Sequence, residues 1–208
     1  MAEASGRIAA GDIFGGLRPR AWVILALSVG VGLYGLSYLT GHAAPPGPAA
    51  NHAGRGWLIV HASCAGLALL LGPWQFVASI RALRPALHRL IGRTYVSLCL
   101  VGGLTGLVLA WNTSSGPVAR WGFLLLAAAW LTTTITAYLA VRRRDFFSHR
   151  RWMIRSFSLT FAAVTLRLYL PLSAVPGLSF DLVYPLTAWA AWVPNLIVAE
   201  IWLRTHRG

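Results

Sequence analysis

The chain has 208 residues, of which 57% are hydrophobic and only 11% are charged, and its mean hydropathy is +0.63. Soluble domains carry roughly 25% charged residues, so this chain has too few charges to cover a water-facing surface. The composition therefore indicates an integral membrane protein. The formal net charge of +13 does not point to nucleic acid, because the arginines lie in short runs between apolar segments.

Six apolar segments are long enough to cross a bilayer core, which takes about 20 helical residues. In chain order they are Ala21–Leu39, Trp57–Ile80, Thr94–Trp111, Trp121–Val141, Met153–Val175 and Leu182–Trp202. The sequence predicts an all-α, polytopic membrane helix bundle over residues 21–202, between short tails at 1–20 and 203–208. The first segment could also be a signal peptide cleaved after Ala43, but its apolar stretch is longer than a signal core. We therefore expect a retained helix.

The arginines predict the orientation of the bundle. With both termini in the cytoplasm, 15 of the 18 basic residues lie inside, only Arg55 and Arg120 lie outside, and Arg167 falls within a segment. This asymmetry follows the positive-inside rule. All basic residues are Arg, which together with the many Ala, Gly and Pro favours a bacterial source. We expect a multi-pass protein of the bacterial cytoplasmic (inner) membrane, with the lipid bilayer and anionic lipid at the inner face as partners. We expect no nucleic-acid partner, and a homo-oligomer is compatible with the sequence.

The third and fifth segments open alike. One begins "HRLIGRTYVSL" at His88 and the other "HRRWMIRSFSL" at His149. The likeness favours two related helical hairpins, formed by segments two and three and by segments four and five, and duplication of this kind points to sites between the halves. The alternative interpretation is that basic residues and histidine simply anchor two helices at the inner surface.

Arg167 lies inside the apolar stretch "LTFAAVTLRLYLPL", residues 159–172. An arginine at the centre of a membrane helix costs about 2.5–3.5 kcal/mol on an insertion scale. Its side chain could reach the outer interface, towards Asp181, or it could face the protein interior. The second interpretation predicts an outer polar pocket, suited to an anion, a haem propionate or a quinone head group. Its residues would be His61, Arg167, Asp181 and Tyr184.

His88 and His149 are predicted at matching depths near the inner face, where they could bind the iron of haem b. A structural zinc would need further ligands, and none is suitably spaced. The competing hypothesis is that both histidines are solvated at the interface. The inner polar and basic face would further comprise Gln75, Arg89, Arg93, Arg150 and Arg155. Glu200 is expected to pair locally with Arg204, one helical turn later.

The run from His61 to Pro171 contains "GPWQF", "HRLIGRTY", "HRRWMIRSFSLT" and "TLR", the last ending at Arg167. With these motifs the chain resembles a family of bacterial predicted multi-pass membrane proteins, a domain of unknown function. The resemblance implies a multi-helix membrane protein and brings no activity with it. A looser likeness is to b-type cytochromes, which hold haem between histidines on paired membrane helices. His88 and His149 match a pairing of helices three and five, whereas helix four has no histidine to partner His61.

Three classes of function are compatible with these features. A membrane redox protein that binds b-type haem or a quinone explains the histidines, Arg167 and the aromatic residues best. A small-molecule transporter or channel explains the hairpins, but a proton- or cation-coupled carrier usually has an acid within the membrane. A non-catalytic membrane assembly protein is the third class. The sequence has no phosphate-binding loop, no zinc-protease motif and no nucleophile elbow, so it shows no apparatus for hydrolase or ATPase chemistry.

Overall fold

The computed structural model describes residues 19–41 and 53–206, which are helical with short connections and contain no strand. The predicted N-terminal tail therefore falls almost entirely outside the described residues. The helices, including two short 3-10 helices (η), are α1 (Pro19–Leu36), α2 (Arg55–Leu71), η2 (Gly72–Phe76), α3 (Ala78–Leu83), α4 (Pro85–Trp111), α5 (Gly116–Arg142), α6 (Phe146–Thr160), α7 (Ala162–Tyr169), η3 (Leu170–Ala174), α8 (Phe180–Ala190) and α9 (Val193–Thr205).

Five helical stretches within this part of the chain are long and apolar enough to cross a membrane. They are Arg55–Phe76, Pro85–Trp111, Gly116–Arg142, Phe146–Ala174 and Phe180–Thr205. Helix α1 is a shorter apolar helix and makes the sixth. The all-α membrane helix bundle is therefore confirmed, although some bounds differ. The third segment begins at Pro85 instead of Thr94, because proline suits the first turn of a helix and the basic residues after it continue the helix.

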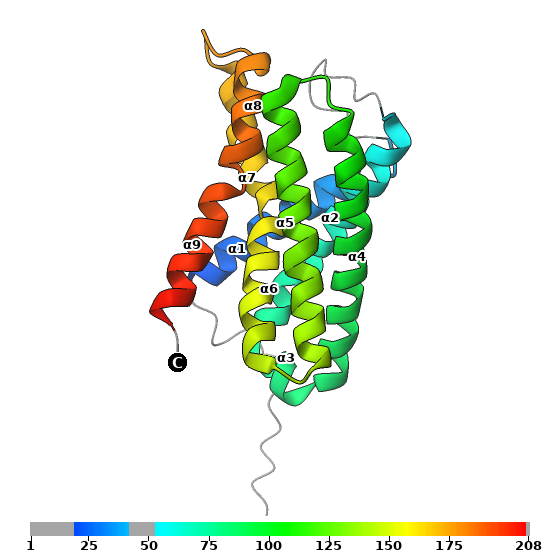
Figure 1. Cartoon of the computed structure of the whole chain (residues 1–208), viewed down its shortest axis with the longest axis vertical. Helices are drawn as coiled ribbons and strands as arrows, with labels where there is room; N and C mark the ends of the chain where they lie inside the picture. Colours follow the sequence, from blue (N-terminus) through cyan, green and yellow to red (C-terminus); the bar gives the residue numbers. More distant parts are fainter. Residues whose placement is uncertain (1–18, 42–52, 207–208) are drawn as a thin grey trace, which may run out of the picture.

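Figure 1 shows α2, α4, α5 and α6 running alongside one another, with α1 crossing the bundle obliquely and α9 turning away from α8. Helix α4 packs on α2 and α5, and α5 also packs on α6 and α8. Large apolar side chains point outward from the bundle; Trp111, Leu104 and Val198 are examples. Such a surface needs lipid around it, as the composition predicts.

Glycines bring α1 close to α2. A Cβ added at Gly66 would lie 2.7 Å from the carbonyl oxygen of Gly32, and one added at Gly35 would lie 2.8 Å from that of Ala62. Small residues at such a crossing let two helix backbones approach closely, because no large side chain stands between them. Helix α1 is therefore part of the bundle and forms one of its walls.

A network of buried hydroxyl groups joins α4, α5 and α6. The Tyr95 hydroxyl lies 3.0 Å from Ser156 Oγ and 2.7 Å from Thr160 Oγ1. The indole of Trp130 donates to Thr160 Oγ1 at 2.8 Å, and Thr134 Oγ1 lies 2.7 Å from Ser156 Oγ. Each of these buried polar groups has a partner, so the network fixes the three helices against one another at little desolvation cost.

Two of the long helical stretches are interrupted at neighbouring positions. The first breaks at Phe161, between α6 and α7, and the second at 191–192, between α8 and α9. Asn195 lies next to both breaks. It follows the second break in the chain, and its side-chain amide donates to groups on either side of the first, the Ser158 carbonyl at 3.3 Å and Thr165 Oγ1 at 2.9 Å. Backbone groups freed by a break inside a membrane need such partners.

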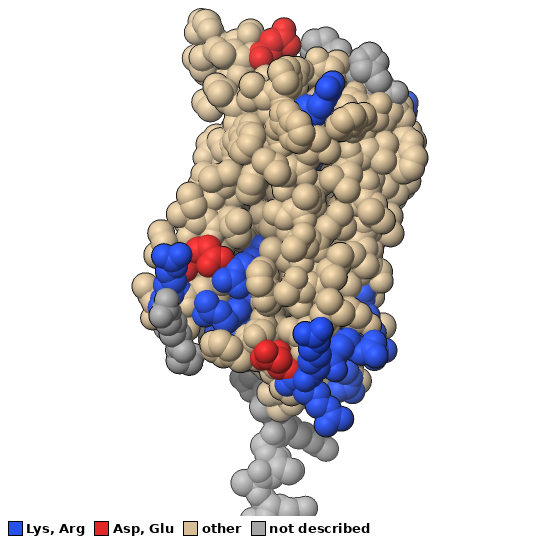
Figure 2. Space-filling view, in the orientation of Figure 1, with Lys and Arg blue, Asp and Glu red and all other residues tan. Residues whose placement is uncertain are grey.

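Arginines gather at one end of the bundle, as Figure 2 shows, and a broad band with few charges separates them from the other end. We call this the arginine-rich end. It comprises Arg81, Arg84, Arg89, Arg93, Arg142, Arg143, Arg144, Arg150 and Arg151. Glu200 lies towards this end, and its carboxylate accepts two hydrogen bonds from Arg155 of α6, the longer at 3.0 Å. The predicted local pair with Arg204 is replaced by this contact between helices, since Arg155 reaches Glu200 from α6 in a forked geometry.

Candidate functional site

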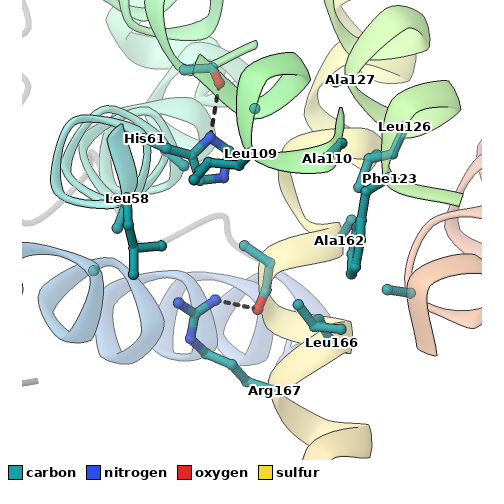
Figure 3. A pocket seen from close by; sticks show the side chains of 18 of the residues that line it. Leu58, His61, Leu109, Ala110, Phe123, Leu126, Ala127, Ala162, Leu166 and Arg167 are labelled. Carbon is teal, nitrogen blue, oxygen red and sulfur yellow. Dashed lines mark hydrogen bonds between the residues drawn. The ribbon is translucent and has the colours of Figure 1, made fainter. Parts of the chain in front are cut away.

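A cavity of about 820 Å³ lies between the helices, in the half of the bundle away from the arginine-rich end. Residues of α1, α2, α4, α5, α6, α7 and α8 line it, and Figure 3 shows side chains from several of these helices facing one space. Its volume falls in the range of about 300–1,000 Å³ that is typical of sites for small ligands.

The cavity wall is mostly apolar and is built from small residues and leucines. Small residues leave the space open where larger ones would fill it, and they come from several helices. Examples are Ala62 and Ala65 on α2, Gly106 on α4, Ala127 on α5 and Ala163 on α7. The wall therefore offers an apolar surface along which a chain or ring of a ligand could lie.

Arg167 supplies a charge inside this space. Its Nη1 donates to the carbonyl oxygen of Ala163 at 2.9 Å, and its guanidinium carbon lies 5.1 Å from the centre of the Tyr34 ring. The phenol groups of Tyr34, Tyr38 and Tyr184 are within electrostatic range of the guanidinium. No carboxylate of the described residues lies within salt-bridge distance of Arg167. The site thus contains a cation surrounded by neutral groups.

His61 faces the same space from α2, as Figure 3 shows. Its Nδ1 lies 2.8 Å from the carbonyl oxygen of Gly102, and because a carbonyl only accepts, Nδ1 carries the proton. In the neutral ring, Nε2 is then a hydrogen-bond acceptor. Gly106 makes room for the ring, since a Cβ there would lie 3.2 Å from its Cε1 atom. The glycines of α4 therefore hold His61 in addition to allowing helix packing.

The cavity extends between two differently built ends. At the end where α2 begins and α4 ends, it is lined by Gly54, Arg55 and Thr113. Gly54 and Arg55 are exposed, so the cavity reaches the surface here, and we call this end the mouth. At the other, Trp130 and Thr160 line it, and both belong to the buried hydroxyl network. Arg55 precedes His61 by six residues, or about 9 Å along the helix.

Three of the four residues predicted for the outer polar pocket come together in this cavity: His61, Arg167 and Tyr184. Asp181 is not among the residues that line it, and it is exposed in the first turn of α8. Sequence reasoning did not identify Tyr34 on α1 and Tyr38 in the turn that follows α1. No spacing marks these tyrosines, because only the crossing of α1 over α2 brings them near Arg167.

The second predicted pair, His88 and His149, lies at the arginine-rich end. The two side chains are close enough to interact electrostatically. The Nδ1 atom of His149 lies 2.9 Å from the carbonyl oxygen of Ala137, so it carries the proton and leaves Nε2 unprotonated in the neutral ring. No group of three or more His, Cys, Asp or Glu side chains that could hold a metal ion occurs in the described ranges 19–41 and 53–206.

The residues of the predicted inner polar and basic face are spread over several environments. Gln75 is buried in η2, with its Oε1 atom 3.0 Å from the position of a Cβ added at Gly92. Arg89 and Arg93 are exposed. Arg150 is also exposed and lies 5.5 Å from the centre of the Trp202 ring. Arg155 is bound to Glu200.

Comparison with known proteins gives one family. A family model described as "Predicted membrane protein (DUF2306)" matches residues 58–203, which include His61, Arg167 and Tyr184 and leave out Arg55 and α1. No curated protein and no solved structure matches the chain.

Proposed function

The chain belongs to this family of predicted membrane proteins, and we propose that it binds a small amphipathic molecule in the cavity. The head group of the ligand would lie beside His61 and Arg167, and its apolar part along the alanine and leucine wall. The observation that supports this proposal is the presence of a guanidinium and an imidazole in a cavity of about 820 Å³ whose wall is otherwise mostly apolar. A few polar groups that fix orientation within an apolar pocket are typical of small-molecule sites.

A quinone is one ligand with the required chemistry, and it would make the protein a membrane redox protein. Its carbonyl oxygens accept hydrogen bonds, as Arg167 requires, and the hydroxyl of the reduced form can donate to Nε2 of His61. A carboxylate with an apolar tail also has oxygens that accept hydrogen bonds. Both ligand types use the same head-group contacts, so binding measurements with each must separate them.

A binding experiment with a pair of matched variants tests the proposal. Ala127 lines the cavity, whereas Ala128, its neighbour on α5, is exposed on the outside of the bundle. Ala127→Phe should fill the cavity and lower the affinity for a short-chain quinone or a short-chain fatty acid at least tenfold, as measured by calorimetry in nanodiscs. Ala128→Phe should leave the affinity unchanged. Equal affinity of both variants, or no binding of either ligand to the unmodified protein, would contradict the proposal.

Haem b is a second candidate, and the placement of His88 and His149 supports it. Both side chains lie at one end of the bundle within electrostatic range of each other, and His149 is held by a backbone carbonyl, as ligating histidines usually are. Absorption spectra of the oxidised and dithionite-reduced protein test this candidate. Sharp bands of six-coordinate haem should disappear in His88→Ala and His149→Ala. A featureless spectrum from folded protein produced with ample haem would contradict it.

For the location, our proposal is a bacterial cytoplasmic membrane with the arginine-rich end in the cytoplasm, next to anionic lipid. The positive-inside rule and the gathering of arginines at one end support this orientation. The mouth would then face outward. Labelling of single cysteines in intact cells tests the orientation: Val175→Cys should react with an impermeant maleimide, and Arg143→Cys should react only after lysis. The reverse pattern would refute it.

A further inference from the structure

We infer that the cavity takes an amphipathic monoanion, specifically a carboxylate with a single apolar chain. This inference rests on the proposed function and adds the charge of the head group. Its starting point is the charge balance around Arg167. The described part of the chain has three acidic side chains, and none of them forms a salt bridge with this guanidinium: Asp145 caps α6, Asp181 is exposed on α8, and Glu200 pairs with Arg155.

The groups that do contact Arg167 do not neutralise it. The Ala163 carbonyl and the Tyr34 ring carry partial negative charge only. A cation in low-dielectric surroundings is stabilised far more by a full counter-ion, particularly one that also accepts its hydrogen bonds. None of the residues that line the cavity, all within the described ranges, is Asp or Glu. A bound anion would therefore supply the charge that the protein lacks at this place.

A carboxylate also fits the donors that surround this point. The planar guanidinium forms paired hydrogen bonds with the two oxygens of a carboxylate. The phenol groups of Tyr34 and Tyr184 are within electrostatic range of the same cation, and a phenol hydroxyl can donate to an anion. One deep cation balances one negative charge, which favours a monoanion over a phosphate dianion. Apolar residues line the cavity next to Arg167, and Leu166 is one that Figure 3 labels. They leave space for the apolar chain of the ligand.

Arg55 at the mouth strengthens the case for an anion. It is the second guanidinium that lines the cavity. Charges of one sign at the mouth of a low-dielectric space raise the local concentration of ligands of opposite sign and speed their association. Arg55 would therefore attract the carboxylate at the mouth, and Arg167 would bind it deeper inside.

Calorimetry with three soluble probes of similar size tests the effect of head-group charge on affinity separately from the binding of any ligand. The probes are octanoate, its neutral analogue octanamide, and a short-chain benzoquinone. We expect the protein in nanodiscs to bind octanoate at least tenfold more tightly than octanamide. Lowering the pH below the pKa of the fatty acid should remove this preference, because the ligand then loses its charge.

Substitutions of single arginines test which guanidinium causes the preference for the charged ligand. Arg167→Gln should reduce the affinity for octanoate to that for octanamide, while Arg167→Lys, which keeps the charge without the fork, should show an intermediate loss. Arg120→Gln is the matched control, since Arg120 is an arginine of the same half of the bundle that does not line the cavity. Arg55→Gln should slow association several-fold at low ionic strength and leave dissociation unchanged.

Each other outcome decides against the inference. Equal affinity for octanoate and octanamide, or tight binding of the quinone without octanoate, would refute the anionic head group and leave the proposed binding function intact. Failure of all three probes to bind folded protein would refute both. If Arg167→Gln does not fold, Arg167→Lys and the pH dependence of octanoate binding still decide the question.

Discussion

Thr134 and its neighbour Thr133 offer a sharp test of the buried hydroxyl network. Both are buried on α5, and valine replaces the hydroxyl of either with a methyl group of similar size. Thr134 Oγ1 bonds to Ser156 Oγ on another helix at 2.7 Å. Thr133 Oγ1 instead donates to the carbonyls of Ala129 and Trp130 within its own helix. Thr and Val are both β-branched, so helix propensity nearly cancels in the comparison.

The structure sets the expected magnitudes. A buried hydrogen bond contributes about 0.5–1.5 kcal/mol to stability, and bonds between membrane helices average about 0.6 kcal/mol. Ser156 retains its bond to Tyr95 when the Thr134 hydroxyl is removed, so no orphaned group adds to the cost. We expect Thr134→Val to lower the free energy of unfolding by about 1 kcal/mol. Thr133→Val should change it by less than about 0.5 kcal/mol, because the carbonyls that it contacts already accept bonds from the helix backbone.

Equilibrium unfolding in mixed micelles with increasing sodium dodecyl sulfate, followed by circular dichroism, measures both values. A double-mutant cycle that combines Thr134→Val with Ser156→Ala should give a coupling energy of about 0.6–1.5 kcal/mol. Equal destabilisation by the two valine variants, or a coupling energy near zero, would refute the network as a source of stability.

Four further variants test the packing of the bundle, the hydrogen bonds beside its helix breaks and the capping of α6. Gly66→Ala should destabilise the protein by about 1–3 kcal/mol, because its Cβ would collide with the backbone of α1, whereas Gly30→Ala, with open space around it, should be neutral or slightly stabilising. Asn195→Leu should cost about 1–2 kcal/mol through the loss of hydrogen bonds that join α6, α7 and α9, measured in the same unfolding assay. The backbone N–H of Ser148 holds the pKa of Asp145 below its usual value. The carboxylate therefore stabilises the start of α6 fully when the pH is above the pKa that Asp145 has in the unfolded chain. This stabilisation is lost as the pH falls through the lower pKa of the folded state. Asp145→Asn should keep the cap and abolish the acid-dependent rise in amide exchange at this turn; an unchanged pH profile would contradict this assignment.

The sequence was sufficient to predict the class of fold, because hydropathy and segment length report directly on a lipid environment. Helix ends were less accurate where basic residues continue a helix beyond its apolar part, as in the turns between Pro85 and Thr94. A hydropathy criterion places such turns outside the segment, although arginine is a good helix former. The breaks at Phe161 and at 191–192 were not predicted, although Pro194 follows the second break by two residues.

The candidate site was only partly accessible from the sequence. Arg167 and His61 stood out because a charge and an imidazole are unusual within apolar segments. The residues that contact them could not be recognised in the sequence. Gly102 accepts a hydrogen bond from His61 through its backbone carbonyl, and Tyr34 contacts Arg167 only because of its position on α1. Such contacts depend on which helix crosses which, and a single sequence does not encode that order in its periodicity. The partner of Glu200 was mistaken for the same reason, since spacing along one helix cannot reveal an arginine on another.

Native mass spectrometry of the protein released from its own membrane tests the central claim, ligand binding in the cavity, most directly. The unmodified protein should carry a small amphipathic molecule, and Ala127→Phe should lose it while the exposed control Ala128→Phe retains it. Identification of the released molecule as a fatty-acid-type carboxylate would support the anionic head group as well. Identical adducts on all three proteins, or none on the unmodified protein, would contradict the account.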